Sequence, residues 1–240
     1  MNLAKIELEN FRSYRQNEFD FNPQGCLIIG PNGCGKTNLL EAIAYCSIGK
    51  SIRFHNDEEL LNFEGQFFRV QGFFLSDQQT PKKVSLIYAD QRKLLKIDEL
   101  PIRQLSTLLE VIKVIYCAPE DHLLISGSPR FRRQYFDLAI SQLYPSYINV
   151  LRHFLHIVQQ RNAMLKRSYS RAEITSWNLS FASSLAEVWN YRKRYLIKVN
   201  TAFQETFKDI FPASTAISLV YLPSLKLPLE SSPEEIIKHL

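Results

Sequence analysis

Eight residues near the amino terminus have the types and spacing of a loop that binds phosphate. Gly30 to Thr37 read GPNGCGKT, which matches the pattern GxxxxGK[ST]. Glycine permits positive φ angles and has no side chain, so consecutive backbone N–H groups can converge on phosphate oxygens. The sequence therefore predicts a nucleoside triphosphate site made by Gly30, Pro31, Asn32, Gly33, Cys34, Gly35, Lys36, Thr37 and the following Asn38.

The last two residues of this loop carry the side-chain chemistry. Lys36 would place a positive charge against the β- and γ-phosphates. The Thr37 hydroxyl would join the coordination shell of a Mg²⁺ ion held jointly with those phosphates. Lys36 and Thr37 are thus the candidate catalytic residues, and Thr37 is the candidate metal ligand.

A phosphate loop must be held between a strand and a helix. Cys26 to Ile29 is a short apolar run that predicts a buried strand, and the residues from about Lys36 to Ile48 predict a helix whose N-terminus adds its dipole to the site. Upstream, Leu3–Leu8 and Asn17–Phe21 predict two further strands. The loop therefore lies in the context that its chemistry requires.

The rest of the chain changes from strand patterns to helix patterns at Pro119. Alternating stretches at 67–74, 83–88 and 94–97 predict an antiparallel meander, and Val111–Tyr116 predicts another buried strand. Beyond Pro119, two long helices with three- and four-residue apolar spacing are expected to pack antiparallel across the connection 166–171.

The tail predicts a strand at Ile217–Leu222 and a helix start at Ser231–Glu235. We interpret the chain as truncated soon after. The expected regions are an ATPase-head part at 1–118, a helical lobe at 119–213 and the start of a return segment at 214–240.

Composition narrows the class of protein. The 240 residues contain 29 Lys and Arg against 24 Asp and Glu, a formal charge of +5 that favours contact with nucleic acid or another anionic surface. Neither a secretory signal nor a run of about 20 apolar residues is present, so we expect a cytoplasmic protein without a membrane segment. The four cysteines lack zinc spacing, which predicts reduced thiols.

A second acidic motif that would complete an ATPase is not found. Such a motif is an apolar strand that ends in Asp, often followed by Glu, and it holds Mg²⁺ and polarises water. Asp90 comes nearest, but it follows Ala89 in a turn-like stretch of the meander. Leu124–Ser128 superficially resembles the LSGGQ signature of transporter ATPases, although Pro129 follows and a helix-capping turn is the simpler interpretation.

Several blocks in a fixed order resemble the bacterial RecF family of recombination mediators, which is related to the SMC and ABC head domains. The blocks are LENFRSY at 8–14, GPNGCGKTNLLEAI at 30–43, GKSIR at 49–53, APED at 118–121, GSPRFRRQYFDLAI at 127–140 and QRNAMLK at 160–166. The resemblance implies an α/β P-loop NTPase of ABC/SMC-head type, with an antiparallel β subdomain and an inserted helical lobe.

The resemblance also implies a function. RecF proteins bind ATP with Mg²⁺, dimerise around it, bind DNA, and act with RecR and RecO in DNA replication, repair of single-strand gaps and the SOS response to DNA damage. The family's signature motif and acidic strand lie in a C-terminal part that this sequence does not contain. The chain is therefore expected to bind ATP without efficient hydrolysis.

Further site residues follow from the matched blocks. Arg12 falls where related heads place an arginine that contacts the nucleotide, although a surface arginine that supports the strand turn is the alternative. Lys50, Arg53, Arg132 and Arg133 are candidate contacts to DNA phosphates, or else solvated surface charges. Glu120 and Asp121 fall roughly where cassette-type heads have a loop that reports on Mg²⁺.

Two other functions remain open at this point. A small-molecule P-loop kinase would share the loop and need an acceptor pocket. A nucleotide-independent interaction fragment would bind a partner such as RecR through its lobes alone. Binding measured with and without ATP distinguishes the second from a nucleotide switch.

Overall fold

The computed structural model describes residues 1–52, 56–212 and 217–240, and it divides into two compact units, Met1–Ser126 and Gly127–Leu240. The first unit contains β1 (Asn2–Phe11), β2 (Tyr14–Asp20), α1 (Lys36–Ile48), the short 3-10 helix η1 (Asp57–Leu60), β3 (Phe67–Leu75), β4 (Pro81–Ala89), β5 (Arg92–Ile97), β6 (Leu100–Ile102), α2 (Leu105–Val111), η2 (Pro119–His122) and α3 (Leu123–Ser126). The second contains α4 (Pro129–Leu143), α5 (Tyr147–Leu165), α6 (Arg171–Ile210) and α7 (Pro233–Lys238).

The first unit is built on a six-stranded antiparallel sheet in the order β2-β1-β3-β4-β5-β6. Only Arg12 and Ser13 separate β1 from β2, so these strands form a tight hairpin. The two N-terminal strands and the antiparallel meander predicted from alternation are confirmed. Apolar and polar residues alternate along these strands because one face of the sheet is packed against the core. The other face carries ion pairs such as Lys5–Glu18 and Arg69–Glu9.

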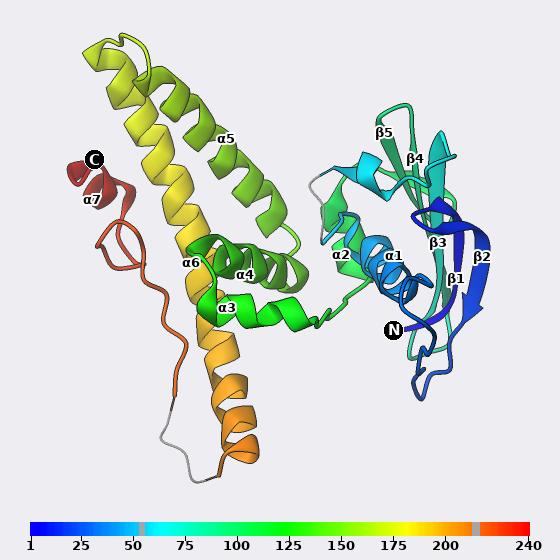
Figure 1. Cartoon of the computed structure of the whole chain (residues 1–240). Coiled ribbons are helices and arrows are strands. Elements are labelled where there is room, and N and C mark those ends of the chain that lie inside the picture. Colours follow the sequence, from blue (N-terminus) through cyan, green and yellow to red (C-terminus); the bar gives the residue numbers. More distant parts are fainter. Residues whose placement is uncertain (53–55, 213–216) are drawn as a thin grey trace. The chain divides into compact units, whose positions relative to one another are not determined.

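Helix α1 covers the inner face of this sheet (Figure 1). Its Leu39, Ala42 and Cys46 are buried at three- and four-residue spacing. They belong to one core with strand residues that include Ile6 and Val70. Burying each large side chain contributes about 1.5–3 kcal/mol, so this contact fixes α1 on the sheet. The predicted helix Lys36–Ile48 is confirmed at both ends.

Helix α1 ends where glycine is required. Gly49 adopts φ +74°, and its N–H donates to the Tyr45 carbonyl at 2.7 Å, which satisfies the last turn. A Cβ at this position would lie 2.5 Å from Cδ2 of Leu105, in α2. Lys93 Nζ donates to the Gly49 carbonyl at 2.8 Å. The turn is therefore both left-handed and tightly enclosed.

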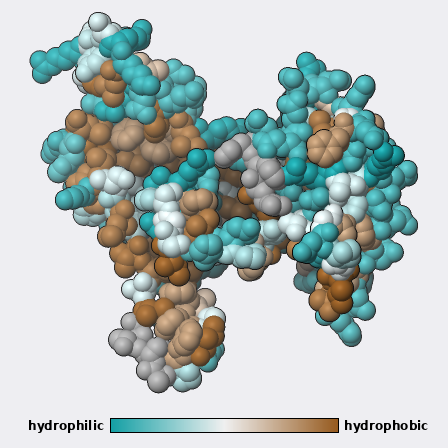
Figure 2. Space-filling model, viewed as in Figure 1, coloured by the Kyte–Doolittle hydropathy of each residue, from teal (hydrophilic) through white to brown (hydrophobic). Residues whose placement is uncertain are grey.

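The second unit is a helical lobe. Helices α5 and α6 pack antiparallel, as predicted, with Phe154 against Phe181 and Arg161 donating to Asn178 at 3.0 Å. A capping box starts α6 at Ser170, whose side chain accepts from the Glu173 N–H. Figure 2 shows apolar side chains gathered over the upper part of this unit, where α7 also packs on α6.

A buried polar cluster joins α4, α5 and α6. Arg192 pairs with Asp137 at 2.9 Å, and the Tyr147 hydroxyl donates to the same carboxylate oxygen at 2.6 Å. Burial raises the pKa of the Tyr147 hydroxyl, which therefore stays protonated and can donate. These bonds satisfy charges that would be costly to bury alone.

Three predicted strands are wrong. Cys26–Ile29, Val111–Tyr116 and Ile217–Leu222 form no strand: Val111 is the last residue of α2, and the other residues have no regular secondary structure. Leu27, Ile115 and Leu222 are 84%, 91% and 84% exposed. A strand requires a neighbour for its backbone N–H and C=O groups. None of the six described strands pairs with these segments.

The boundary between the two units lies eight residues after the position expected from sequence, which was between 118 and 119. The first compact unit ends at Ser126 and the second begins at Gly127, so η2 and α3, which follow Ala118, belong to the first unit. The second expected boundary, between 213 and 214, falls outside the described residues.

We expect Gly49→Ala to lower the free energy of unfolding by about 2–4 kcal/mol, because left-handed backbone strain and the collision with Leu105 add together. Gly25→Ala is the matched control. Gly25 also has positive φ, +120°, but no heavy atom of the described residues lies within 4 Å of the position that a methyl group would take there. It should lose only about 1 kcal/mol. Urea unfolding measures both, and equal losses would show that the collision is relieved.

Candidate nucleotide-binding site

The N-terminus of α1 is open to an anion. Gly35 is the N-cap, in the left-handed conformation with φ +99°, and no side chain of the described residues caps the helix. The first turn contains no acidic residue. No carboxylate in this turn therefore offsets the positive end of the helix dipole, and the backbone N–H groups stay available for an anion. A phosphate site requires both conditions.

Lys36 closes the loop on itself. Its Nζ donates to the carbonyls of Gly30 and Pro31, both at 2.7 Å, and lies 3.9 Å from Sγ of Cys34. The ammonium group therefore sits among the carbonyls at the start of the loop. Lys36 is also the first residue of α1, so a phosphate at the helix N-terminus would compete with these carbonyls for the ammonium group.

The tip of the β1–β2 hairpin rests on the first turn of α1. The Tyr14 hydroxyl donates to the Gly35 carbonyl at 3.0 Å, and Asn38 Nδ2 donates to Ser13 Oγ at 2.9 Å. A Cβ on Gly35 would lie 2.8 Å from the Tyr14 oxygen, so only glycine allows this approach. Burial raises the pKa of the Tyr14 hydroxyl, with a smaller contribution from Cys34, and keeps it a donor.

Arg12, at the same hairpin tip, reaches α1 from the side. Its Nε donates to Oε2 of Glu41 at 3.4 Å, and Ser51 Oγ donates to Oε1 of that carboxylate at 3.1 Å. The Glu41 side chain is fully buried, whereas that of Arg12 is 21% exposed. The structure thus brings Arg12 to the helix that carries the loop.

The other loop residues predicted from sequence lie near the surface. Pro31, Asn32, Gly33 and Cys34 are exposed, and Thr37 is in the first turn of α1. Among the described residues, no group of three His, Cys, Asp or Glu side chains could hold a metal ion by itself. Mg²⁺ at this site would depend on the phosphates and Thr37.

The predicted DNA contacts are distributed over both units. Lys50 is exposed just after α1, and Arg132 and Arg133 are exposed in the first turns of α4. Arg132 Nη1 also donates to the Gly127 carbonyl at 3.2 Å. Arg53 lies outside the described residues.

The acidic candidates serve local structure. Asp121 Oδ2 accepts from the Ala118 N–H at 3.0 Å and so caps its own 3-10 helix. Asp90 has φ +49° in the two-residue turn between β4 and β5, which agrees with the turn-like interpretation of its sequence. Ser128 occupies the N-cap position of α4 before Pro129, as the capping-turn interpretation expects.

Glu41, Tyr14 and Asn62, whose Nδ2 donates to the Arg12 carbonyl at 2.6 Å, were missed by sequence reasoning. Glu41 could have been found, because it lies four and seven positions before Tyr45 and Ile48 and therefore falls on an inward stripe of α1. An acidic residue on such a stripe indicates a buried partner. Tyr14 and Asn62 leave no comparable signal, since their partners depend on tertiary structure.

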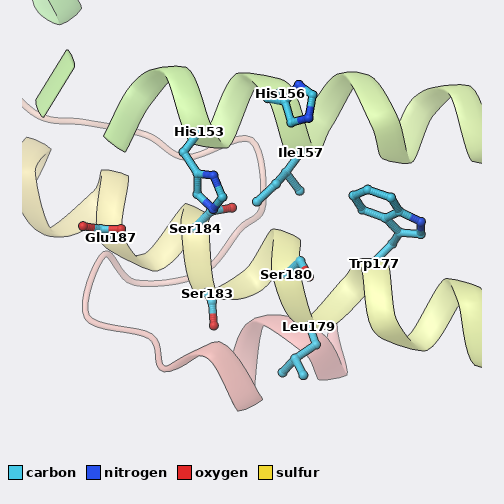
Figure 3. Close-up of a pocket in the computed structure, with 9 residues that line it drawn as sticks. All are labelled: His153, His156, Ile157, Trp177, Leu179, Ser180, Ser183, Ser184 and Glu187. Atoms are coloured by element: carbon cyan, nitrogen blue, oxygen red, sulfur yellow. The ribbon is translucent and has the colours of Figure 1, made fainter. Parts of the chain in front are cut away.

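A groove of about 550 Å³ lies elsewhere, along the seam of α5 and α6. Figure 3 shows His153 and Ile157 from α5 and Trp177 from α6 turned toward the space between the helices. Glu187 is its one acidic lining residue among the described ones, and no lysine or arginine lines it. The groove therefore lacks the cations that a triphosphate needs.

Comparison with known proteins decides the family. A family model described as an AAA domain matches residues 5–211. The chain belongs to the AAA domain family. Among the described residues, this AAA domain chain has no helix that is both long and apolar enough to span a membrane.

Relatives of the AAA domain chain are RecF proteins, which confirms the resemblance found in the sequence. It is 31% identical over 226 residues to DNA replication and repair protein RecF of Desulfitobacterium hafniense, covering 92% of this chain and 62% of that protein. It is 33% identical over 237 residues to RecF of Heliobacterium modesticaldum, covering 97% and 63%. The chain thus spans less than two thirds of the length of these relatives.

A solved structure supports the same fold. The recombination mediator protein RecF with ATPrS, from the RecFOR pathway, matches with a TM-score of 0.88 and 26% identity. The match covers 99% of this chain and 65% of that one. The expected fold, a P-loop NTPase head with an antiparallel β subdomain and a helical lobe, is therefore confirmed.

We expect thiol labelling to separate the cysteines by burial. Cys26, Cys34 and Cys117 are exposed, whereas Cys46 is fully buried, and burial raises the pKa of its thiol to about 12. At a pH of about 8 the thiolate that reacts is therefore scarce at Cys46. Iodoacetamide followed by mass spectrometry should modify the first three in the native chain, and Cys46 only after unfolding. Rapid native labelling of Cys46 would contradict the packing of α1.

Proposed function

We propose that this chain is the nucleotide-binding part of a RecF-type recombination mediator, which binds ATP and uses it to control contact with DNA. The main support is the uncapped N-terminus of α1, with Lys36 and the glycine loop beside it and no acidic residue in its first turn. The similarity to the solved structure of RecF with ATPrS supports ATP as the nucleotide.

The roles of the loop residues follow from this site. Backbone N–H groups of Gly33 to Thr37 would hold phosphate oxygens, and Lys36 would exchange its carbonyl partners for the β- and γ-phosphates. Mg²⁺ would neutralise developing phosphate charge, and Thr37 would help to hold it. Arg12, which donates to Glu41 in the second turn of α1, would add a guanidinium on that side of the helix.

We also propose that the described residues bind ATP without hydrolysing it efficiently. Hydrolysis needs an acid that polarises the attacking water. Asp90 lies in the tight turn that joins β4 to β5, and Asp121 caps a 3-10 helix, so both acids already serve local structure. The activity of a complete family member therefore depends on more than these side chains.

DNA, RecR, RecO and a second copy of the chain are the proposed partners, in the cytoplasm. Exposed Lys50, Arg132 and Arg133 would contact backbone phosphates, which gives affinity without sequence preference. ATP-gated dimerisation would combine such contacts from two subunits. Replication and repair of single-strand gaps is the process that this activity would serve, as the names of the relatives support.

The decisive variant is Lys36→Met. We expect it to weaken ATP binding by at least about tenfold, because it removes a charge-assisted contact to the phosphates. We also expect it to abolish the ATP-dependent part of DNA binding, measured as the salt dependence of duplex affinity with and without ATP and Mg²⁺. Lys226→Met removes the same charge from a position in the other unit and is the control.

Two results would contradict the proposal. If Lys36→Met behaves like the parent chain in DNA binding, nucleotide does not gate that contact. If the parent chain binds RecR with equal affinity in the presence and absence of ATP and does not bind DNA, the interaction-fragment function is favoured instead.

We expect alkylation of Cys34 to block ATP binding, because the thiol lies within the loop and 3.9 Å from Lys36 Nζ. The test uses a chain with Cys26→Ser and Cys117→Ser, in which Cys34 is the exposed thiol that remains. The matched control keeps Cys117 and carries Cys26→Ser and Cys34→Ser. Calorimetry should show loss of ATP binding after alkylation in the first chain alone; unchanged affinity there would refute the prediction.

A further inference from the structure

Glu41 is the only acidic residue of α1, and it is completely buried. It lies five positions after Lys36, on the helix that carries the loop. A buried carboxylate costs several kcal/mol unless it is paired. Its partners therefore indicate why it is there.

Two side chains from different segments hold this carboxylate. Ser51 Oγ, just beyond the end of α1, donates to Oε1 at 3.1 Å. Arg12 Nε, at the β1–β2 hairpin tip, donates to Oε2 at 3.4 Å. Since Ser51 engages one oxygen, the carboxylate is oriented with the other toward Arg12.

The backbone of Arg12 is fixed independently of its side chain. Its φ is +53°, a conformation that non-glycine residues rarely adopt. Its N–H donates to the Leu60 carbonyl at 2.8 Å, and its own carbonyl accepts from Asn62 Nδ2 at 2.6 Å. Because the backbone is held on both sides, the direction of the guanidinium depends only on the side-chain torsion angles of Arg12. The bond to Glu41 restricts those angles.

The residues that follow Arg12 lie against the nucleotide loop. Ser13 accepts from Asn38, and Tyr14 donates to Gly35, both at the first turn of α1. Arg12 therefore directly precedes the residues that contact this turn, and its guanidinium reaches the same helix in the next turn, at Glu41. A guanidinium already oriented there loses less side-chain freedom when an anion binds.

We propose that Glu41 is a positioning residue for the nucleotide, which acts by holding the Arg12 guanidinium beside the loop, and that Ser51 orients the Glu41 carboxylate. The inference rests on the proposed ATP binding and names a residue that does not itself touch the nucleotide. It requires that the effect of Glu41 on ATP affinity pass through Arg12.

A double-mutant cycle tests this requirement. ATP affinity, in the presence of Mg²⁺, is measured by calorimetry for the parent chain, Glu41→Gln, Arg12→Gln and the double variant. We expect each single variant to bind about tenfold more weakly, because a charge-assisted contact is lost or misdirected. The double variant should also bind about tenfold more weakly, rather than a hundredfold, because the second change removes nothing further.

A purely structural role for Glu41 gives a different result. If Glu41 only stabilises α1, Glu41→Gln would weaken ATP binding by the same factor whether or not Arg12 is present, and additive losses would overturn the inference. Thermal unfolding of all four chains shows whether each is folded at the temperature of the titration.

Ser51→Ala is a milder second variant, usable if Glu41→Gln does not fold. We expect it to weaken ATP binding about threefold, and to have no effect in the Arg12→Gln background. Ser47→Ala is the matched control, since Ser47 is a buried serine of α1 that donates to the Ile43 carbonyl of its own helix. It should leave ATP affinity unchanged. Equal losses for Ser51→Ala and Ser47→Ala would contradict the inference.

The parent chain separates this inference from the proposed function. If the parent does not bind ATP, the proposed function itself fails. The positioning role alone fails under three conditions met together: the parent chain binds ATP, Lys36→Met abolishes that binding, and the losses from the Glu41 and Arg12 variants are additive.

Discussion

The candidate site depends on an asymmetry of α1: the sides of the helix are packed and its first turn is open. Leu39, Ala42 and Cys46 anchor it in the core of the first unit. Gly35, in the left-handed conformation, turns the chain into the helix without a side-chain cap from the described residues. Burial supplies the free energy that holds the helix in place, so its uncompensated N-terminus can be kept for a ligand.

In the structure, the ammonium group of Lys36 is hydrogen-bonded to carbonyls of its own loop. Lys36 Nζ donates to two carbonyls at 2.7 Å, and a phosphate must replace these bonds to gain the ammonium group. The ammonium group is charged in both arrangements, but a phosphate oxygen carries a negative charge and a carbonyl oxygen carries only a partial one, so phosphate attracts it more strongly. The exchange therefore favours phosphate, and its cost is small because the lysine already lies beside the loop.

Local patterns were sufficient to predict the elements that position this site. Glycine spacing predicted the loop, and helix formers predicted α1 with both ends, because these signals depend on neighbouring residues. The predictions that failed are strands, because a strand forms only if it pairs with another segment of the fold. Cys26–Ile29 has the composition of a strand, yet Leu27 and Ile29 are 84% and 82% exposed, since no described strand pairs with that segment. The contact of Tyr14 with Gly35 likewise joins positions that no sequence pattern links.

Glu41 poses the sharper physical question, because a negative charge beside an anion site opposes the binding of phosphate. Stability does not explain its presence: a buried ion pair is often no more stabilising than apolar side chains of similar volume. An apolar residue at position 41 could pack as well against the core, but it could not direct a guanidinium. The pair with Arg12 offsets the carboxylate charge, and the direction that it imposes on Arg12 is the one property that packing alone would not supply.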